Sequence, residues 1–368
     1  MSSPQEVLKD MDKRQSHVDE LIKQSGEGFP LKHISTYRGD DIAIPWAIDG
    51  IIEQGGHTTI FGASESYKTF LGLDMGACMA SDTEWHGHPV QQCGVGYIVG
   101  EGHAGIMQRM LAWETHHGIS LDNCPFYLSS VPAQLTVEED AISVAKAIEN
   151  IPNVGAVFID TMSRNFGPGN ENSTQDMANY IGLIDRHIRN RYGCAIIHIH
   201  HTGLLDTTRS RGSGVLRAAM ESEFMVEKIG DSVTFTCSKM KNAPHPRGMQ
   251  FTPREVELSK QDKDGEPIIS IVLDYEGEPE PGKKGITKGM GPNQMKARAI
   301  LIGLYADHRK NVGADREPRV KHDDWLRACR NEGMKRQQVW EVVNTLEKRK
   351  IVFRNPPYVY LQENDRQA

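Results

Sequence analysis

One short stretch constrains the fold more than any other, the loop Gly62–Thr69, which reads Gly-Ala-Ser-Glu-Ser-Tyr-Lys-Thr. It follows a β-rich run, His57–Phe61, and precedes a segment whose apolar residues recur at helical spacing from Phe70 to Met79. A strand, a tight loop and a helix in this order gather the free N–H groups of the loop and of the helix N-terminus around one point, which favours an anion there. The stretch therefore predicts a phosphate-binding loop, and the alternative is a chance turn before a buried helix.

Within this loop, Lys68 would reach the β- and γ-phosphates of ATP, and the Thr69 hydroxyl would coordinate Mg²⁺. The match to G-x-x-x-x-G-K-[ST] is incomplete, because Tyr67 stands where the second glycine is expected and its backbone must accept a Cβ. Glu65 brings a negative charge beside the loop, which is unfavourable unless its side chain points outward. We expect the ATP contacts to come from Gly62, Ala63, Ser64, Glu65, Ser66, Tyr67, Lys68, Thr69 and Phe70.

A second signal lies at the end of a near-continuous apolar run, Val154–Ile159, which is followed by Asp160. Such a run is typical of a parallel strand that is buried on both faces. A carboxylate at the C-terminal edge of this strand is placed to hold Mg²⁺ together with Thr69. A helix N-cap is the alternative for Asp160, but it would not need the apolar strand before it.

The rest of the pattern alternates strands and helices, which predicts an α/β fold with a mostly parallel sheet flanked by helices on both faces. Several β-like runs without intervening helices follow residue 222, and they indicate an antiparallel extension of the sheet. The expected strands are 57–61, 94–99, 126–128, 154–159, 194–199, 223–227, 232–240, 249–258 and 268–273. The polar segments 163–176 and 203–214 are expected to be surface loops outside the core.

The chain of 368 residues is long enough for two domains. We expect an N-terminal helical arm and linker at 1–44, an ATPase core at 45–275, a linker at 276–292 and a small domain at 293–368. The last of these shows three helices followed by a β-hairpin, which is the order of a winged helix.

The small C-terminal domain is also basic. Lys283–Arg354 holds 18 Lys and Arg against 8 Asp and Glu, in a chain whose net charge is −7. This charge indicates an anionic partner such as nucleic acid, and a solvated lysine-rich surface is the alternative.

The remaining composition is that of an ordinary globular protein. The six cysteines are scattered without a C-x-x-C pair, which fits reduced thiols better than disulfides or a zinc site. The N-terminus lacks the apolar segment of a signal peptide, and no run is long enough to span a bilayer. A cytoplasmic location without membrane contact is therefore expected.

Several motifs occur in one order: the phosphate loop, Gly100-Glu101-Gly102, the strand ending in Asp160, His200-His201, and Arg211-Gly212-Ser213. In this order the chain resembles the RecA-like ATPases, and most closely the branch of plasmid and phage replicative helicases typified by the RepA hexameric helicase. The resemblance covers roughly residues 45–275. The departures at Glu65 and Tyr67 are not part of the family pattern.

The resemblance implies a role for each matched residue. Glu101 would orient and deprotonate the water that attacks the γ-phosphate. His200 or His201 would sense the γ-phosphate and transmit its presence to the following loop. Arg211 would be an arginine finger supplied to a neighbouring subunit, and Lys239 would act beside it or be an ordinary exposed cation.

The function implied is a ring-forming motor, a hexamer with shared ATP sites, that translocates on single-stranded DNA in replication and that contacts further replication proteins. The two loops 163–176 and 203–214 would face the DNA channel. Two other possibilities stay open. One is a non-motor DNA-binding initiator that uses ATP as an assembly switch, and the other is a recombination or repair ATPase that forms filaments.

Overall fold

The computed structural model describes residues 43–100, 102–203, 208–261, 263–279, 290–312, 319–349 and 351–361. The expected N-terminal arm lies almost wholly outside these residues, and so does Glu101.

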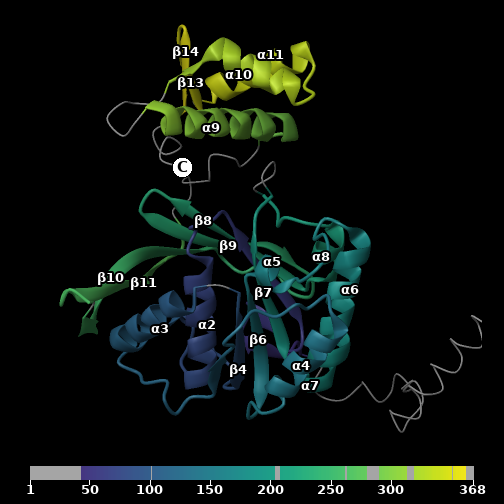
Figure 1. The fold of residues 1–368 in the computed structure, drawn as a ribbon, viewed down its shortest axis with the longest axis vertical. Helices are drawn as coiled ribbons and strands as arrows, with labels where there is room; N and C mark the ends of the chain where they lie inside the picture. The colour runs from purple at the N-terminus through teal and green to yellow at the C-terminus, as the bar shows by residue number, and fades with distance from the viewer. Residues whose placement is uncertain are drawn as a thin grey trace, which may run out of the picture. The chain divides into compact units, whose positions relative to one another are not determined.

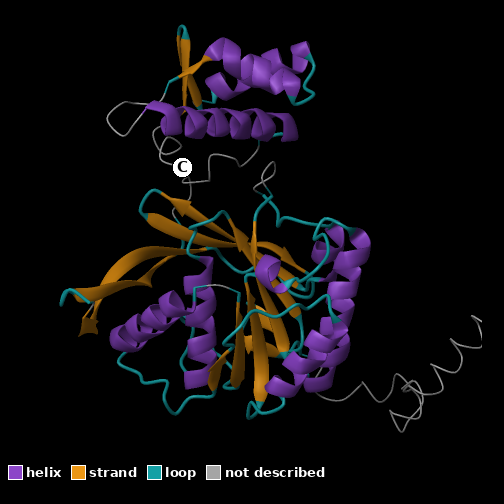
Figure 2. Cartoon of the chain, viewed as in Figure 1, coloured by secondary structure: helices purple, strands orange, loops and turns teal. Residues whose placement is uncertain are grey.

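A large sheet with strand order β11-β10-β9-β8-β3-β7-β6-β4-β5 forms the centre of the expected ATPase core (Figures 1 and 2). In this spatial order, the neighbours within β8-β3-β7-β6-β4-β5 pair in parallel, and the neighbours within β11-β10-β9-β8 pair antiparallel. This confirms the predicted fold class, including the antiparallel extension. The strands are β3 (His57–Gly62), β4 (Gly94–Val99), β5 (Phe126–Leu128), β6 (Val154–Asp160), β7 (Ala195–His201), β8 (Ser222–Ile229), β9 (Ser232–Met240), β10 (Met249–Gln261) and β11 (Pro267–Gly277).

Helices cover both faces of the sheet (Figure 1). One face carries α2 (Lys68–Ser81) and α3 (His103–His117), and the other carries α4 (Glu138–Ile148), α6 (Thr174–Ile184), the π-helical turn η2 (Asp185–Arg189), α7 (Asn190–Tyr192) and α8 (Gly214–Ala219). A short helix, α5 (Met162–Asn165), follows β6, and a small hairpin, β1 (Trp46–Ile48) and β2 (Ile52–Glu53), precedes β3.

Alternate residues of the central strands enter two different hydrophobic cores. Phe158 and Ile197 belong to the core under α2 and α3, whereas Val157 and Ile196 belong to the core under α4 and α6. Side chains alternate across a strand, so both sets must be apolar when both faces are covered. This is why β6 reads as an unbroken apolar run.

The C-terminal segment, residues 290–361, contains α9 (Pro292–Val312), β12 (Val320–Lys321), α10 (His322–Asn331), α11 (Arg336–Lys348), β13 (Val352–Asn355) and β14 (Tyr358–Leu361). Its three strands form an antiparallel sheet of order β12-β14-β13. Trp325, Leu301 and Leu346 are fully buried in a core built from this segment alone. No helix among the described residues is long and apolar enough to cross a membrane.

The expectation that 163–176 lies wholly outside the core is wrong. Asn165 is 0% exposed and Phe166 is 3% exposed, and the Phe166 ring stacks on Tyr180 of α6. The Asn165 side chain accepts a hydrogen bond from the Ala133 N–H over 2.9 Å. A polar side chain with such partners can be buried. The polar composition of the segment therefore did not reveal that Asn165 and Phe166 lie in the core.

Candidate functional site

The predicted phosphate loop lies between the end of β3 and the start of α2, so the expected order of strand, loop and helix is present. Gly62 begins it, and only glycine fits there. A Cβ at this position would lie 2.2 Å from the Val226 carbonyl oxygen and 2.6 Å from Ser66 Oγ. The close approach of β8 thus fixes the identity of the first residue of the loop.

The departures from the glycine pattern have a visible geometry. Tyr67 adopts the left-handed conformation with φ 68° and ψ 17° as the N-cap of α2, and Glu65 has φ 62°. This conformation costs a non-glycine residue about 1–2 kcal/mol. The Tyr67 ring lies 5.4 Å from Phe70 and 5.6 Å from Lys228 Nζ, and Glu65 is exposed. The loop therefore keeps a glycine-like backbone while its acidic residue faces solvent.

Lys68 is buried beneath the loop, where its ammonium donates a hydrogen bond to the Ala63 carbonyl and lies 3.4 Å from Ser66 Oγ. Burial lowers its pKa to about 8, and the Asp160 carboxylate partly opposes this effect. A partly desolvated ammonium gains much from an anionic ligand. The position and burial of Lys68 fit the expectation that it binds phosphate oxygens.

Asp160 ends β6 at the same edge of the sheet and is 5% exposed. Its carboxylate accepts a hydrogen bond from Tyr97 OH over 2.7 Å and is also hydrogen-bonded to Thr69. Burial raises the pKa of Asp160, while these hydrogen bonds and the charge of Lys68 lower it. The structure thus brings together Lys68, Thr69 and Asp160. The Thr69 hydroxyl and the Asp160 carboxylate supply the hard oxygen ligands that Mg²⁺ prefers.

Two functional candidates at this edge were not predicted from the sequence. Tyr97, on β4, is 1% exposed and donates to Asp160. Arg109, on α3, lowers the pKa of Asp160 through its charge. The sequence signal that could have identified Arg109 is its position two helical turns after Gly100–Gly102.

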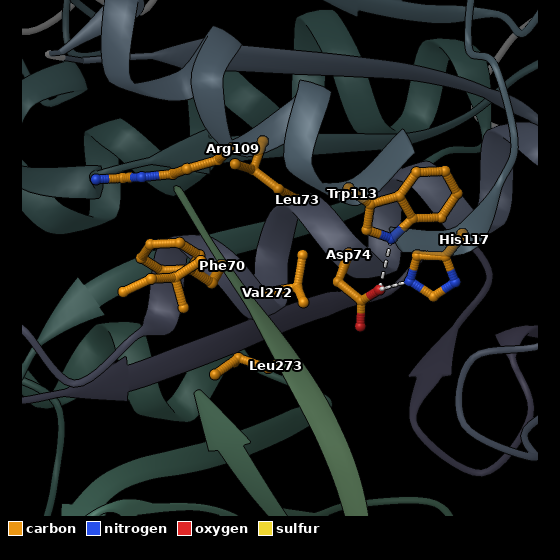
Figure 3. A pocket seen from close by; sticks show the side chains of 9 residues that line it. Phe70, Leu73, Asp74, Arg109, Trp113, His117, Val272 and Leu273 are labelled. Carbon is orange, nitrogen blue, oxygen red and sulfur yellow. Dashed lines mark hydrogen bonds and ion pairs between the residues drawn. The ribbon is translucent and has the colours of Figure 1, made fainter. Parts of the chain in front are cut away.

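Arg109 also lines a pocket between α2, α3 and β11 (Figure 3). Its guanidinium carbon lies 4.5 Å from the centre of the Phe70 ring, one residue after Thr69. Deeper in the pocket, Asp74 accepts hydrogen bonds from the indole N–H groups of Trp85 and Trp113, each over 2.8 Å. The Phe70–Arg109 pair gives the pocket a flat, cationic wall that can contact an aromatic ring system.

The glycines on both sides of position 101 are held close to Asp160 and α3. The Gly100 N–H donates to the Asp160 carbonyl over 2.6 Å, and a Cβ on Gly100 would lie 2.5 Å from Arg164 Cβ. Gly102 has φ +73° and caps the start of α3. Close packing therefore restricts position 100 to glycine, and the left-handed backbone favours glycine at position 102.

The two histidines lie at the end of β7, and His201 pairs with Gly62 in the sheet. His200 is fully buried, and one of its ring nitrogens, Nε2, lies 2.8 Å from the Arg211 carbonyl oxygen. Burial lowers its pKa to about 4. The neutral ring therefore joins the strand next to the phosphate loop to the segment that carries Arg211.

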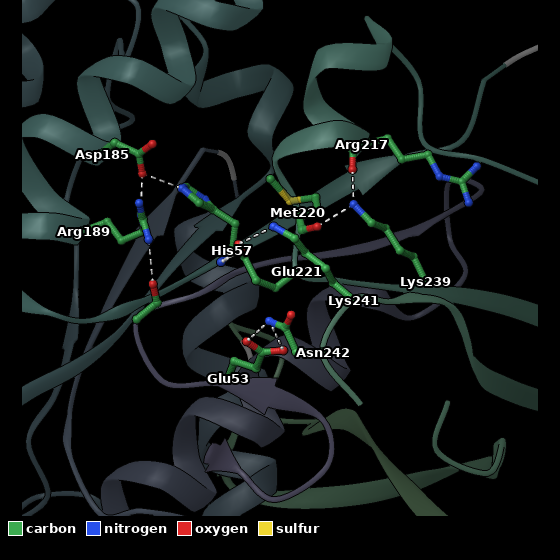
Figure 4. Close-up of polar contacts among 11 residues, drawn as sticks. Glu53, His57, Asp185, Arg189, Arg217, Met220, Glu221, Lys239, Lys241 and Asn242 are labelled. Atoms are coloured by element: carbon green, nitrogen blue, oxygen red, sulfur yellow. Dashed lines mark hydrogen bonds and ion pairs between the residues drawn. The ribbon is translucent and has the colours of Figure 1, made fainter. Parts of the chain in front are cut away.

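The two predicted cations both have partners within the chain. Arg211 forms an ion pair with Glu171 over 2.5 Å and donates to Ser163 Oγ over 2.9 Å. Lys239, on β9, donates to the carbonyls of Arg217 and Met220 at the C-terminus of α8 (Figure 4). This contact gives Lys239 a helix-capping role.

A further polar network lies at the opposite end of β3, as Figure 4 shows. The ring nitrogen Nε2 of His57 lies 2.8 Å from an oxygen of Asp185. The backbone N–H of His57 donates a hydrogen bond to the Glu221 carboxylate over 2.7 Å. Lys241 Nζ lies 3.9 Å from Glu221. This network joins β3 to η2 and is remote from the phosphate loop along the strand.

Taken with the sheet order, this site has the arrangement expected of a phosphate-binding loop on a mostly parallel sheet flanked by helices. A family model described as "AAA domain" matches residues 35–206, which include the phosphate loop and Asp160. No curated protein matches the chain.

Similar solved structures are distant in sequence. One, described as an ATPase domain, is 12% identical with a TM-score of 0.45, covering 64% of this chain and 94% of that one. The RadB recombinase is 14% identical with a TM-score of 0.41, covering 55% and 88%. A DnaB-like replicative helicase, from a structure that also concerns its interactions with primase, is 12% identical with a TM-score of 0.45, covering 67% and 71%.

Proposed function

We propose that this protein is an ATP-hydrolysing motor of DNA replication that forms a ring, most similar to the RepA-type hexameric helicases, and translocates on single-stranded DNA. The convergence of Lys68, Thr69 and Asp160 at one edge of the sheet is the observation that carries the ATPase part. The order of the sequence motifs, from the phosphate loop to Arg211-Gly212-Ser213, supports ring formation and translocation on DNA. ATP turnover measured with and without single-stranded DNA tests the proposal, and turnover that DNA does not stimulate would contradict a motor.

In the proposed reaction, Lys68 binds the β- and γ-phosphates, and the loop N–H groups hold the remaining phosphate oxygens. Thr69 and Asp160 would hold Mg²⁺, which neutralises charge on the phosphates when bound. Phe70 and Arg109 would contact the adenine base, because their stacked pair adjoins the loop. Glu101 would take the proton of the attacking water, and Arg211 would stabilise charge on the phosphoryl group of a neighbouring subunit.

A second candidate function is a DNA-binding initiator that uses ATP as an assembly switch rather than as fuel. The departures from the glycine pattern of the loop at Glu65 and Tyr67 favour it, because both are non-glycine residues with a left-handed backbone in the loop. ATP-dependent assembly without DNA-stimulated turnover would distinguish this function from a motor.

Replacing Glu101 with Gln should preserve ATP and DNA binding but reduce turnover on the order of 100- to 10,000-fold. Glutamine keeps the shape of the side chain but cannot accept the proton of the attacking water. Steady-state phosphate release, with ATP binding measured separately, checks this expectation. Glu84→Gln, at a residue outside the site, serves as the control. Turnover near that of the wild type would mean that another carboxylate accepts the proton of the attacking water.

Removing residues 283–368 should weaken binding to DNA and flatten its salt dependence, while the basal ATPase survives. We propose that this segment is a winged helix, and 18 Lys and Arg residues between 283 and 354 leave with it. Fewer phosphate contacts release fewer counterions on binding, so the slope of log K against log salt decreases. Fluorescence anisotropy with a labelled oligonucleotide measures this slope. An unchanged slope would indicate that the segment binds a protein partner instead of DNA.

A further inference from the structure

Two segments that are separate in sequence are joined by one cluster of polar side chains beside the sensor histidines. Glu171 accepts a hydrogen bond from Ser163 Oγ over 2.9 Å, and its other oxygen forms the ion pair with Arg211 over 2.5 Å. Arg211 also donates to Ser163 Oγ over 2.9 Å. Each of the three side chains thus contacts the other two.

The backbones of the two segments are also bound to each other at this cluster. The Ser213 N–H donates to the Glu171 carbonyl over 2.9 Å, and a Cβ on Gly212 would lie 3.0 Å from the same oxygen. The Arg211 N–H donates to the His201 carbonyl over 2.9 Å. The position of Arg211 is therefore set both by the end of β7 and by Glu171.

Arg211, which the proposed function assigns to the nucleotide of a neighbouring subunit and which lies in a loop expected to face DNA, is thus already paired within its own chain. The Arg211 side chain is 36% exposed and that of Glu171 is 16% exposed, so the pair lies at the protein surface and can open without unfolding of the core. The Glu171 carboxylate neutralises the charge of the guanidinium, so a phosphate from outside the chain must compete with this carboxylate for Arg211.

We propose that Glu171 restrains Arg211, so that Arg211 binds a phosphate group from outside the chain only after the Glu171–Arg211 ion pair opens. The phosphate has two sources, the nucleotide held by an adjacent copy of the chain or the backbone of single-stranded DNA. This inference rests on the proposed function for the identity of the phosphate, but the restraint itself does not.

The test uses Glu171→Gln in the full-length protein, because glutamine keeps the size of the side chain and removes its charge. Glu149→Gln is the matched control, since Glu149 forms an exposed ion pair with Arg191 over 3.4 Å outside this cluster. Limited trypsin digestion followed by mass spectrometry measures the release of Arg211 directly. Cleavage after Arg211 should be about two- to fivefold faster in Glu171→Gln than in the wild type and the control.

Two functional measurements then distinguish the sources of phosphate. If Arg211 serves an adjacent copy, Glu171→Gln raises ATP turnover without DNA about two- to fivefold. If it serves DNA, the salt slope for binding a thymidine oligonucleotide steepens by about 0.7, the value for one added phosphate contact. Either result supports the restraint.

Ser163→Ala, which removes the hydroxyl between the two charges, should shift cleavage in the same direction and shows that the result does not depend on one variant. Cleavage after Arg211 at the wild-type rate in both folded variants, judged by circular dichroism, would overturn the inference. A wild-type protein that neither turns over ATP nor binds DNA would instead overturn the proposed function, and the proteolysis result would still decide the restraint.

Discussion

Lys68→Ala should lower the affinity for ATP on the order of 100-fold and abolish turnover, because a charged hydrogen-bond donor to phosphate is removed from a buried site. Among the described residues, Lys68 is the cation that lies beneath the loop, and its burial lowers its pKa to about 8. Calorimetric titration with ATP and Mg²⁺ measures the loss directly.

The matched control for this variant is Lys241→Ala. Lys241 is also a lysine near a carboxylate, 3.9 Å from Glu221, but it lies in the network at the other end of β3 and its side chain is 56% exposed. The control should bind ATP as the wild type does. Unchanged ATP affinity in Lys68→Ala would mean that Gly62–Thr69 is not the phosphate loop.

Arg211→Ala should bind ATP nearly normally yet hydrolyse it on the order of a thousandfold more slowly, if Arg211 acts on the nucleotide of a neighbouring subunit. The expectation follows from the role of an arginine finger, which stabilises charge only in the transition state. ATP binding and turnover are measured on the same preparation, so that loss of one without the other is visible.

Mixing Arg211→Ala with Lys68→Ala tests whether the ATP site is shared. Each variant alone should be inactive, but mixed assemblies contain interfaces that pair an intact phosphate loop with an intact arginine. A fraction of the wild-type turnover should therefore return. No recovery at any ratio, in assemblies shown to have exchanged subunits, would place Arg211 in the site of its own subunit or in contact with DNA.

The features that the sequence predicted are those with a local physical cause. The apolar run before Asp160 and the strand-loop-helix pattern around Lys68 depend on neighbours in the chain, and both lie where they were expected. The antiparallel strands after residue 222 were also predicted correctly, because each run ends at a turn before the next begins.

The features that were missed depend on contacts between distant segments. Tyr97 contacts Asp160 because β4 and β6 are neighbours in the sheet, and nothing in the local sequence of Tyr97 shows this. The Glu171–Arg211 ion pair joins residues 40 positions apart, so the sequence showed each charge but not their pairing. The burial of Asn165 likewise depends on its partner Ala133.

The left-handed Tyr67 has a consequence for the entropy of the phosphate loop. A glycine at that position can adopt many backbone conformations, and a loop that contains it must lose that freedom when it closes on a ligand. Tyr67 has few conformations to lose, and its ring is held by contacts with Phe70 and Lys228. The cost of ordering this residue is thus met when the chain folds, so we expect the loop to be preorganised for the phosphate proposed above, at the expense of a strained backbone.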